Sequence, residues 1–478
     1  MTTTSQRSIA TAVWGKALAN PAPEFPLTQL SILAGAIPLG LSGTLYRNGP
    51  GRLERAGQRV GHWLDGDGAI LAVKFADGAA SGVYRYVQTD GYQGESKVDR
   101  WLYGNYGMLP AGNIWERRGK SFKNAANTSV LALPDRLLAL WEGGMPHALN
   151  LDNLETIGTD NLGYDSRPLV YSAHPKVDPI SGHIYNFGIS IGMQPKLNLY
   201  QSDRTGKIIK HTQTKLPRLT TFHDFLMVGK YLVFCIPPIE IQPLPIVFGL
   251  ASYSESMRWK PELGTQILVF DREDLSLISS FTVEPWFQWH FGNGYIDPDG
   301  NIICDLVRYA DFATNQFLRE VASGETQTLA IGTLWQLVID PIASQLVSSA
   351  QLSDRSCEFP VVAQAQVGQA WQYTYLAVHK LDTILDRELV GTIGRFDRHT
   401  HTLTTAEIDK NLYPTEPIHV VDKFDSTQGW ILTIIYDGAN HQSKVWIYDS
   451  DRLNEAPVCR LGLPSVVPMG FHGTWKST

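Results

Sequence analysis

A strand–turn–strand unit recurs six times along the chain, and it limits the folds that the chain can adopt. In each copy an apolar stretch ends in Asp, a turn follows and a second strand returns, as in LYQSDRTGKII and LVFDREDLSLIS. Asp suits this position because its carboxylate accepts hydrogen bonds from the backbone N–H groups of the turn. The copies contain Asp152, Asp203, Asp271, Asp340, Asp397 and Asp449, which follow one another at intervals of 51 to 69 residues.

The spacing of these units favours a β-propeller. Repeats of about 40–50 residues that each form a four-stranded sheet are typical of propeller blades. Six hairpins, with further chain at both ends, predict about seven blades, some of them with insertions. A pair of irregular β-sandwiches is the alternative. An all-β fold is also predicted by short β-branched or aromatic segments between turn residues, namely Tyr231–Ile236, Gln266–Phe270, Asn301–Leu306, Trp371–Val378 and Trp430–Tyr436.

No linker divides the chain, since its 478 residues contain no Ser/Gly tract, charge block or low-complexity run. We therefore expect one domain over residues 1–478, with residues 1–25 as an N-terminal extension. The apolar stretch before Pro21 is interrupted by Lys16, so we expect neither a secretory signal nor a transmembrane helix. This predicts a cytoplasmic protein.

The charge of the chain argues against a nucleic-acid partner, and its cysteine spacing argues against disulfides and a zinc site. The net charge is −7 and no basic stripe is present, which argues against nucleic-acid binding. The four cysteines lie far apart with no CxxC spacing, so we expect reduced thiols rather than disulfides or a zinc site. They are Cys235, Cys304, Cys357 and Cys459.

Four of the 13 histidines occupy the same place in four different repeat units. Each lies well before the hairpin Asp, where one exists, at the point where the inner strand of a blade begins. Side chains at that point face the propeller axis, so the four rings are candidate metal ligands. They are His174 in SAHPKVDP, His223 in TFHDF, His290 in FQWHFGNGY and His472 in GFHGTW.

Three glutamates occupy equivalent places in other units: Glu142, Glu358 and Glu416. A buried carboxylate is costly unless it is paired. If the imidazoles bind a metal, the ring N–H that faces away from the metal donates to a carboxylate and fixes the tautomer. Imidazole suits Fe, Zn, Cu and Ni alike, so the residues alone leave the metal open.

The other histidines have a simpler interpretation. His399 and His401 are close in sequence but lie in the turn of the Asp397 hairpin, where an exposed polar turn is expected. The remaining seven are expected to be core residues whose hydrogen bonds are satisfied: His62, His147, His183, His211, His379, His419 and His441.

Taken together, several motifs resemble the carotenoid cleavage oxygenases, and within that family the cyanobacterial apocarotenoid-cleaving branch. They follow one another in the family's order over nearly the whole chain: IPLGLSGTLYRNGPG, HWLDGDG, KNAANTSV, SAHPKVDP, FHDF, CEFPVV, TEPIHVV and FHGTW. The resemblance implies a seven-bladed propeller with a dome of loops and short helices over an axial metal site. The four histidines would hold one Fe(2+) per chain, and the three glutamates would accept from their outer ring nitrogens.

The resemblance also implies the reaction. Fe(II) and O2 would split a double bond of an apolar polyene, an apocarotenal, into two aldehydes, at the 15,15′ position to give retinal. Thr128 would crowd a vacant coordination position beside the iron. Trp141, Tyr309, Trp289 and Phe222 are expected to line the substrate tunnel.

Some positions depart from the family's pattern. These departures are expected to affect the shape of the substrate tunnel. Gly294 and Ile296 replace the Ala and Glu that often follow the third histidine, and Thr221 and Leu64 stand where close relatives tend to have aromatics. Three alternatives therefore remain beside carotenoid cleavage: a stilbene-cleaving oxygenase of the same fold, a non-catalytic propeller that binds isoprenoids, and a scaffold propeller.

An apolar run, Ile236–Leu250, is too short to span a membrane and contains four prolines. A buried loop across the dome is one interpretation. The interpretation that the resemblance favours is an exposed apolar patch at the tunnel mouth that dips into one leaflet. The expectation is then a cytoplasmic protein in peripheral contact with a membrane.

Overall fold

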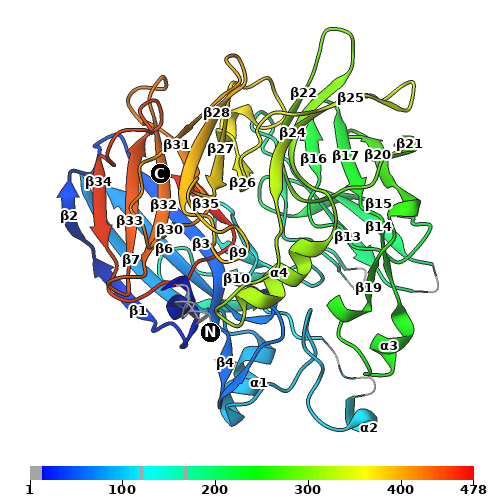
Figure 1. Ribbon diagram of the computed structural model, residues 1–478, viewed down its shortest axis with the longest axis horizontal. Helices are drawn as coiled ribbons and strands as arrows, with labels where there is room; N and C mark the ends of the chain where they lie inside the picture. The colour runs from blue at the N-terminus through cyan, green and yellow to red at the C-terminus, as the bar shows by residue number, and fades with distance from the viewer. Residues whose placement is uncertain (1–12, 118–119, 121, 166–168, 193) are drawn as a thin grey trace, which may run out of the picture.

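Seven antiparallel sheets follow one another along the chain and close into a ring, the blades of a β-propeller (Figure 1). The computed structural model describes the whole chain except residues 1–12, 118–119, 121, 166–168 and 193. The predicted seven-bladed fold is thus confirmed.

Within each blade the strands lie in order from the axis of the ring to its rim. From the axis outward, blade 1 consists of β35 (Gly473–Ser477), β3 (Gly43–Arg52), β6 (Asp67–Ala76), β7 (Ala79–Tyr86) and β1 (Phe25–Gln29). Blade 2 consists of β8 (Ser129–Ala132), β9 (Leu137–Leu140), β10 (His147–Leu149) and β11 (Thr156–Thr159). Blade 3 consists of β12 (Lys176–Val177), β13 (Ile184–Ser190), β14 (Lys196–Ser202) and β15 (Ile208–Lys215).

Blades 4 to 7 continue in the same manner. Blade 4 consists of β16 (Leu226–Val228), β17 (Tyr231–Ile236), β20 (Thr265–Asp271) and β21 (Leu277–Val283). Blade 5 consists of β22 (Phe287–Ile296), β23 (Ile302–Tyr309), β24 (Gly332–Asp340) and β25 (Gln345–Gln351). Blade 6 consists of β26 (Cys357–Val361), β27 (Tyr373–Val378), β28 (Thr392–Asp397) and β29 (Thr402–Thr405). Blade 7 consists of β30 (Leu412–Pro414) and β31 (Ile418–Val421), which both pair with β32 (Gly429–Asp437), then β33 (Gln442–Asp449), β34 (Cys459–Gly462) and β2 (Ser31–Gly35).

Both ends of the chain close the ring. The C-terminal strand β35 pairs with β3 as the innermost strand of blade 1, while the early strand β2 pairs with β34 at the outer edge of blade 7. The stretch expected only as an extension is partly packed, because a 3-10 helix, η1 (Val13–Leu18), buries Trp14 completely. The ring is therefore held by hydrogen bonds between chain segments more than 400 residues apart.

The core lies between successive blades, so the inner strands are covered on both faces. β17 is buried at every position and has the bounds predicted from its apolar sequence. A strand covered on both faces forms a continuous apolar run rather than an alternating one. The other four predicted strands correspond to β20, β23, β27 and β32 with ends that differ by at most three residues.

The predicted hairpins join the third and fourth strands of the blades. Asp203 Oδ1 accepts from the backbone N of Thr205 at 2.8 Å, and Asp271 does the same for Glu273 at 2.7 Å. One assignment was wrong: in blade 2 the turn is capped by Asn150, whose Oδ1 accepts from the backbone N of Asp152 itself at 2.9 Å. Asn and Asp share the side-chain oxygen that this turn needs, so either residue can cap it.

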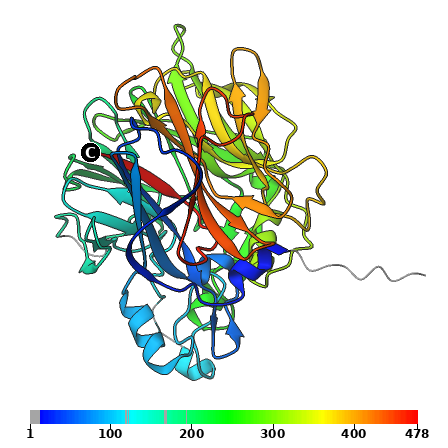
Figure 2. The ribbon, with the colours of Figure 1, turned by 90° about the vertical axis from the view of Figure 1, so that its left-hand side faces the viewer.

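Short helices and loops form a dome over one end of the ring, in the lower half of Figure 1 and at the bottom of Figure 2. Its helices are α1 (Asp90–Val98), α2 (Ile114–Arg117), α3 (Pro243–Val247), α4 (Ala313–Val321) and the 3-10 turns η2 (Trp63–Asp65), η3 (Ser254–Ser256) and η4 (Pro261–Leu263). The remaining elements are two small ribbons and a further turn: β4 (Glu54–Arg55) with β5 (Gln58–Arg59), β18 (Ile239–Ile241) with β19 (Met257–Trp259), and η5 (Gln364–Gln366).

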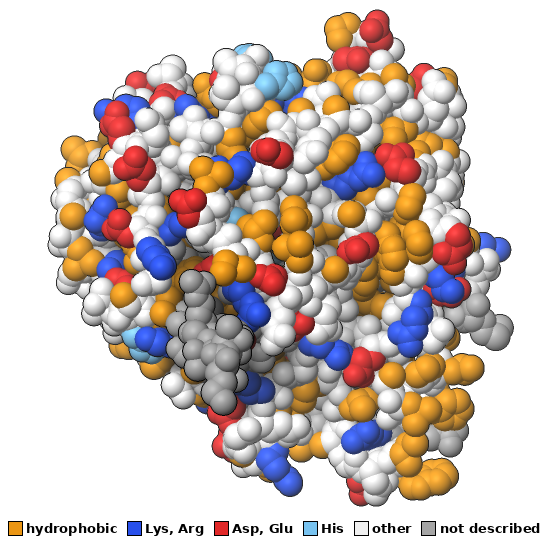
Figure 3. Space-filling view, in the orientation of Figure 1, with side chains coloured by type: hydrophobic (Ala, Val, Ile, Leu, Met, Phe, Trp, Pro, Cys, Tyr) orange, Lys and Arg blue, Asp and Glu red, His pale blue; other side chains and the backbone are white. Residues whose placement is uncertain are grey.

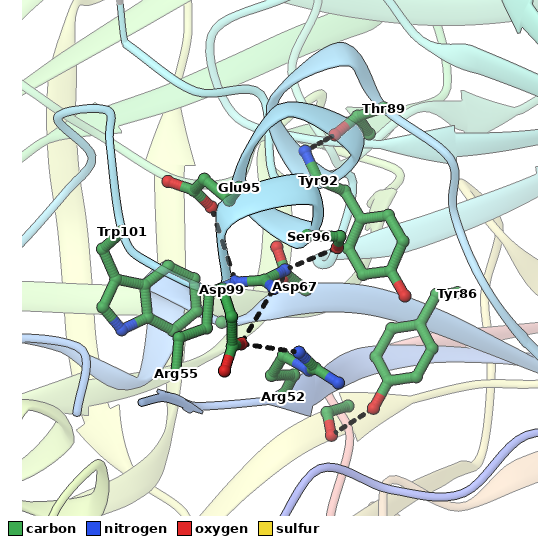
Figure 4. Close-up of polar contacts among 12 residues, drawn as sticks. Arg52, Arg55, Asp67, Tyr86, Thr89, Tyr92, Glu95, Ser96, Asp99 and Trp101 are labelled. Atoms are coloured by element: carbon green, nitrogen blue, oxygen red, sulfur yellow. Dashed lines mark hydrogen bonds and ion pairs between the residues drawn. The ribbon is translucent and has the colours of Figure 1, made fainter. Parts of the chain in front are cut away.

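A buried ionic cluster fixes α1 to blade 1 (Figure 4). Arg55 lies 2.6 Å from Asp67 Oδ2, and Lys123 bridges Asp67 and Glu95, with its Nζ 2.6 Å from Glu95 Oε2. All four side chains are at most 2% exposed, and the Arg55 guanidinium also lies over the Trp101 ring. Because each charge has an opposite partner, the cluster can hold the dome without leaving a buried ion unpaired.

Candidate metal centre and adjoining cavities

The four candidate ligands converge on the axis beneath the dome. His174 and His223 lie just before β12 and β16, His290 lies in β22, and His472 lies just before β35. One ring nitrogen from each lies within 4.8 Å of the others, and every side chain is at most 10% exposed. The repeat position of these residues therefore places them together, as the sequence predicted.

The donor set fits a metal ion. The Nε2 atoms of His174 and His223 are 2.8 Å apart, and those of His290 and His472 are 3.1 Å apart. Two ligands at right angles around a metal, with bonds of ~2.1 Å, would be separated by ~3 Å. Three of the rings direct Nδ1 at a carboxylate, which fixes the proton on Nδ1 and leaves Nε2 as a bare lone pair. Several lone pairs that face one another in this way need a cation between them.

Three glutamates accept from these outer nitrogens, as expected. His290 Nδ1 lies 2.6 Å from Glu358 Oε2, His472 Nδ1 lies 2.8 Å from Glu416 Oε1, and His223 Nδ1 lies 3.0 Å from Glu142 Oε1.

The predicted equivalence of the three glutamates was partly wrong. Glu358 lies in the inner strand of blade 6, β26, and Glu416 lies between β30 and β31 at the inner edge of blade 7, but Glu142 follows the second strand of blade 2, β9. The residue at the start of the inner strand of that blade is Thr128. Glu142 reaches the site because the end of β9 lies beside the start of β8, and its side chain stays 32% exposed.

Further groups around the site were not singled out from the sequence. The Arg47 guanidinium lies 2.8 Å from Glu416 Oε2. His174, which has no glutamate, faces Asp224 Oδ1 at 3.8 Å, and that carboxylate pairs with Lys176 at 2.7 Å. Asp224 directly follows His223 in the chain, which could have drawn attention to it. Arg47 and Glu416 are 369 positions apart, so the sequence around either residue does not indicate their pairing.

Burial and mutual contact favour the neutral, metal-binding form of His174 and His472, whereas at His290 burial is outweighed by Glu358, which raises the pKa of that ring. Burial, reinforced by the other three histidines, holds the pKa of His174 well below its usual value. Burial lowers the pKa of His472 to about 4, even though Glu416 opposes the shift. Burial works against ionisation of Glu416, but His472 and Arg47 outweigh it and lower the pKa of that carboxyl. Neutral imidazoles beside ionised carboxylates are the state that a bound cation requires.

Two cavities meet at the histidine cluster. The larger has a volume of about 870 Å³ and extends under the dome, over the ends of blades 2 and 3. The smaller has a volume of about 120 Å³ and lies toward blades 5, 6 and 7. Leu64, Thr128, His223 and Trp289 line both. A long ligand in the larger cavity would therefore pass directly beside the cluster.

Comparison with known proteins agrees with this architecture. The retinal pigment epithelial membrane protein family matches residues 18–477. The apocarotenoid-15,15′-oxygenase of Synechocystis is 33% identical over 99% of this chain and 98% of its own. A resveratrol cleavage oxygenase of Aspergillus fumigatus is 25% identical over 95% of this chain and 93% of its own. A cobalt-substituted Synechocystis apocarotenoid oxygenase superposes with a TM-score of 0.89 at 31% identity, covering 98% of each chain.

The chain belongs to the retinal pigment epithelial membrane protein family.

The positions that the family resemblance assigned to substrate lie around the cavities. Trp141, Phe222 and Trp289 line the large cavity, whereas Tyr309 lines only the small one, where its hydroxyl donates to Glu358 Oε1 at 3.1 Å. Thr128 is 3% exposed and borders both cavities. Thr221 and Leu64, which depart from the pattern of close relatives, also line the large cavity. These two departures thus fall on the cavity wall, whereas Gly294 and Ile296 lie in neither cavity and pack against Leu226 and Gly229 of blade 4. All four leave the histidines intact.

The histidines set aside as structural behave only partly as expected, because His441 is exposed and the Nδ1 atom of His419 has no hydrogen-bond partner within the described residues. His399 and His401 lie in an exposed turn. His62 is fully buried between the backbone N of Leu64, which donates to its Nδ1, and the carbonyl of Asn315. His147 is an exception: it lines the large cavity, and its buried Nδ1 has no hydrogen-bond partner within the described residues.

The apolar run Ile236–Leu250 divides into two parts. Ile236, Ile239 and Ile241 are buried, so the expectation of an exposed patch was wrong for the first half, which packs as β17 and β18. In the second half, Leu244, Val247 and Leu250 are 58–66% exposed on and after α3.

Hydrophobic side chains gather at the lower right of Figure 3, over α2 and α3. On α2, Ile114 and Trp115 are 45% and 80% exposed. Among the described residues no helix is both long and apolar enough to cross a membrane.

Proposed function

We propose that this protein is a non-haem Fe(II) oxygenase that cleaves a carbon–carbon double bond of an apocarotenal with O2, at the 15,15′ position, to give retinal and a second aldehyde. The observation that carries the proposal is the set of four buried imidazoles at the floor of an apolar cavity. The 33% identity to an apocarotenoid-15,15′-oxygenase over the whole chain supports the choice of substrate and bond.

Iron is the metal that we propose for the site, with His174, His223, His290 and His472 as its ligands. Four neutral imidazoles leave coordination positions for a further ligand, and an Fe(II) bound there supplies the redox chemistry that activates O2. The related structure described as cobalt-substituted supports the presence of a metal in a protein of this fold.

The chain's own residues have three tasks in this reaction. Glu142, Glu358 and Glu416 orient three of the rings and keep their Nε2 atoms unprotonated. Trp141, Phe222 and Trp289 supply apolar surface that holds the polyene and excludes water. Thr128, which borders both cavities, narrows the space on one side of the metal so that one face of the polyene is presented to it.

Access to the substrate requires contact with a membrane, because a polyene of this kind is apolar. We propose that the side chains exposed on α2 and α3, which we call the α3 patch (Ile114, Trp115, Leu244, Val247, Leu250), insert into one leaflet. Gly249, at the end of this segment, lies against Arg117 of α2, so the two helices form one surface.

Turnover under air tests the proposal. Iron-loaded protein is incubated with an apocarotenal in detergent, and the long-wavelength absorbance of the polyene is followed while the products are separated. We expect loss of that absorbance with retinal as a product, and no loss without O2. Cleavage of a stilbene such as resveratrol in place of the apocarotenal, the substrate class for which the Aspergillus relative is named, would overturn the substrate assignment.

A further inference from the structure

One arginine is buried beside the histidine cluster. Arg47, in β3, is 4% exposed, and its Nη1 atom lies 2.8 Å from Glu416 Oε2. Nη1 also donates to the backbone carbonyl of Glu416 at 3.2 Å, and Nη2 donates to that of Phe471 at 3.0 Å. The guanidinium is thus held by Glu416 and by the residue just before His472. Arg47 lines neither cavity at the cluster, so it can act on the site only through these neighbours.

Glu416 differs from the other two glutamates in having a charged partner. Besides Arg47, its carboxylate accepts from His472 Nδ1 and from the backbone N of Gly473, both at 2.8 Å. Three donors and no acceptor around the carboxylate are the surroundings of an ionised group. Among the described residues, neither Glu142 nor Glu358 forms an ion pair with Lys or Arg. Arg47 therefore neutralises one of the three carboxylates that accept from the rings.

The charges around the rings match one divalent cation. Four carboxylates lie against the histidines, namely Glu142, Glu358, Glu416 and Asp224. Arg47 neutralises Glu416. Lys176, whose Nζ lies 2.7 Å from Asp224 Oδ1, neutralises that carboxylate. Two negative charges remain, and a metal ion of charge two balances them. Because an uncompensated charge is costly at a buried site, this balance favours a divalent ion over a trivalent one.

We propose that Arg47 keeps iron in this site in its ferrous form by completing the charge balance. The inference rests on the proposed function, which requires Fe(II). Without the charge of Arg47 the surroundings would carry three negative charges, which match Fe(III) instead. Arg47 touches neither the substrate cavities nor the histidine rings, so it tunes the metal through Glu416 and His472. If Arg47 only joined blade 7 to blade 1, its loss would lower stability and leave the redox equilibrium of the iron unchanged.

Redox titration of the iron-loaded protein tests the proposal and needs neither O2 nor substrate. Mediators set the potential, and the fraction of ferric iron is followed by electron paramagnetic resonance. A unit charge ~10 Å away, at an effective dielectric constant of ~20, changes the ratio of the two forms by roughly tenfold, which is ~59 mV for a one-electron couple. In Arg47→Met the ratio of ferric to ferrous iron at a given potential should rise by this factor, so the midpoint potential should fall.

A charge change of the opposite sign should have the opposite effect. Glu416→Gln removes a negative charge, while its amide oxygen can still accept from His472 Nδ1, so the midpoint potential should rise. The double variant Arg47→Met with Glu416→Gln restores the balance, and its potential should lie between those of the two single variants. A loss of packing alone would not produce shifts of opposite sign that offset each other.

Further variants separate charge from structure. Arg47→Lys keeps the charge but loses the second arm that holds Phe471, so the wild-type potential should persist at reduced stability. Arg398→Met removes a cation from another buried carboxylate, Asp305, in the turn after β28, and should leave the potential unchanged. If Arg47→Met does not fold, the polar, uncharged Arg47→Gln takes its place.

Two results would overturn the proposal. One is an unchanged midpoint potential in the uncharged Arg47 variant, or a shift no larger than that of Arg398→Met. The other is loss of iron from that variant, because removal of a positive charge should strengthen the binding of a cation, and its loss would assign Arg47 to the scaffold alone.

The outcome for Arg47 is distinct from the outcome for the proposed function. Shifts of the expected signs in a protein that does not cleave an apocarotenal under air would refute the reaction and leave the role of Arg47 standing. Cleavage by the wild type together with equal potentials in all variants would refute the role of Arg47 and leave the reaction standing. A protein that retains no iron would refute both.

Discussion

The Nδ1 atom of His290, in blade 5, lies 2.6 Å from the Oε2 atom of Glu358, in blade 6. The contact joins the inner strands of two blades, so it sets the direction of the imidazole and the spacing of the blades together. The opposite oxygen, Oε1, accepts from the Tyr309 hydroxyl, which holds the carboxylate in place.

Replacement of Glu358 by Ala should weaken metal binding by about 10–100-fold, because His290 loses the acceptor that fixes its tautomer. Competition with a chelator of known affinity measures the change. The exposed Glu407 of the same blade provides the control, and Glu407→Ala should bind metal as the wild type does. Equal affinity in Glu358→Ala would contradict the role of this carboxylate.

The α3 patch should carry the membrane contact. Leu244→Ser with Val247→Ser removes apolar area that would otherwise be buried in the leaflet, at ~0.8 kcal/mol for each lost methylene, so vesicle binding should fall at least tenfold. Sedimentation with phosphatidylcholine vesicles measures this. The matched control is Ile180→Ser with Ile342→Ser, two side chains 82% and 78% exposed in turns at the end of the ring away from the dome. If both double variants lose binding equally, the patch is not the contact.

The buried ionic cluster should contribute strongly to stability. Lys123→Met leaves two carboxylates, Asp67 and Glu95, with one cation fewer, and an uncompensated buried charge costs about 3–5 kcal/mol. Urea unfolding measures the change. Lys74→Met breaks an exposed pair with Asp152 and should change stability by no more than about 0.5 kcal/mol. A Lys123→Met variant as stable as the wild type would show that the cluster is dispensable.

Stability should fall with acid in part because of His62. Burial lowers the pKa of His62 to about 3, whereas the unfolded chain titrates near 6.5. Below pH 6.5 the unfolded state therefore binds a proton that the folded state does not, and stability drops by up to about 1.4 kcal/mol for each pH unit. Urea unfolding at pH 7.5 and pH 5.5 checks this. In His62→Gln the drop should be smaller by about 1.4 kcal/mol, and an equal drop would contradict the assignment.

The ring of blades was predictable because its signals are local. Asp203 and Asp271 cap their turns through the same side-chain chemistry, and that chemistry repeats once in each unit. The histidines could be located for the same reason, since a residue at the start of each inner strand must face the axis. Asn and Asp can both cap such a turn, and in blade 2 the pattern predicted Asp152 where Asn150 forms the cap.

Contacts between distant segments were not predictable. Arg47 and Glu416 meet only because the ring closes, and nothing near either residue indicates the other. Glu142 was identified through the motif around it, but its place after β9 depends on how β8 and β9 pair. The missing partner of His147 likewise depends on the groups that surround it in space.

Iron titration of the metal-free protein tests the central claim most directly. Cleavage of an apocarotenal and bound iron are measured in the same samples as Fe(II) is added without excess. Activity should rise in proportion to bound iron and stop rising at one Fe per chain. His223→Ala should neither retain iron nor cleave, while His399→Ala should match the wild type. Iron binding by His223→Ala at wild-type stoichiometry, or full activity without iron, would contradict the four-histidine site.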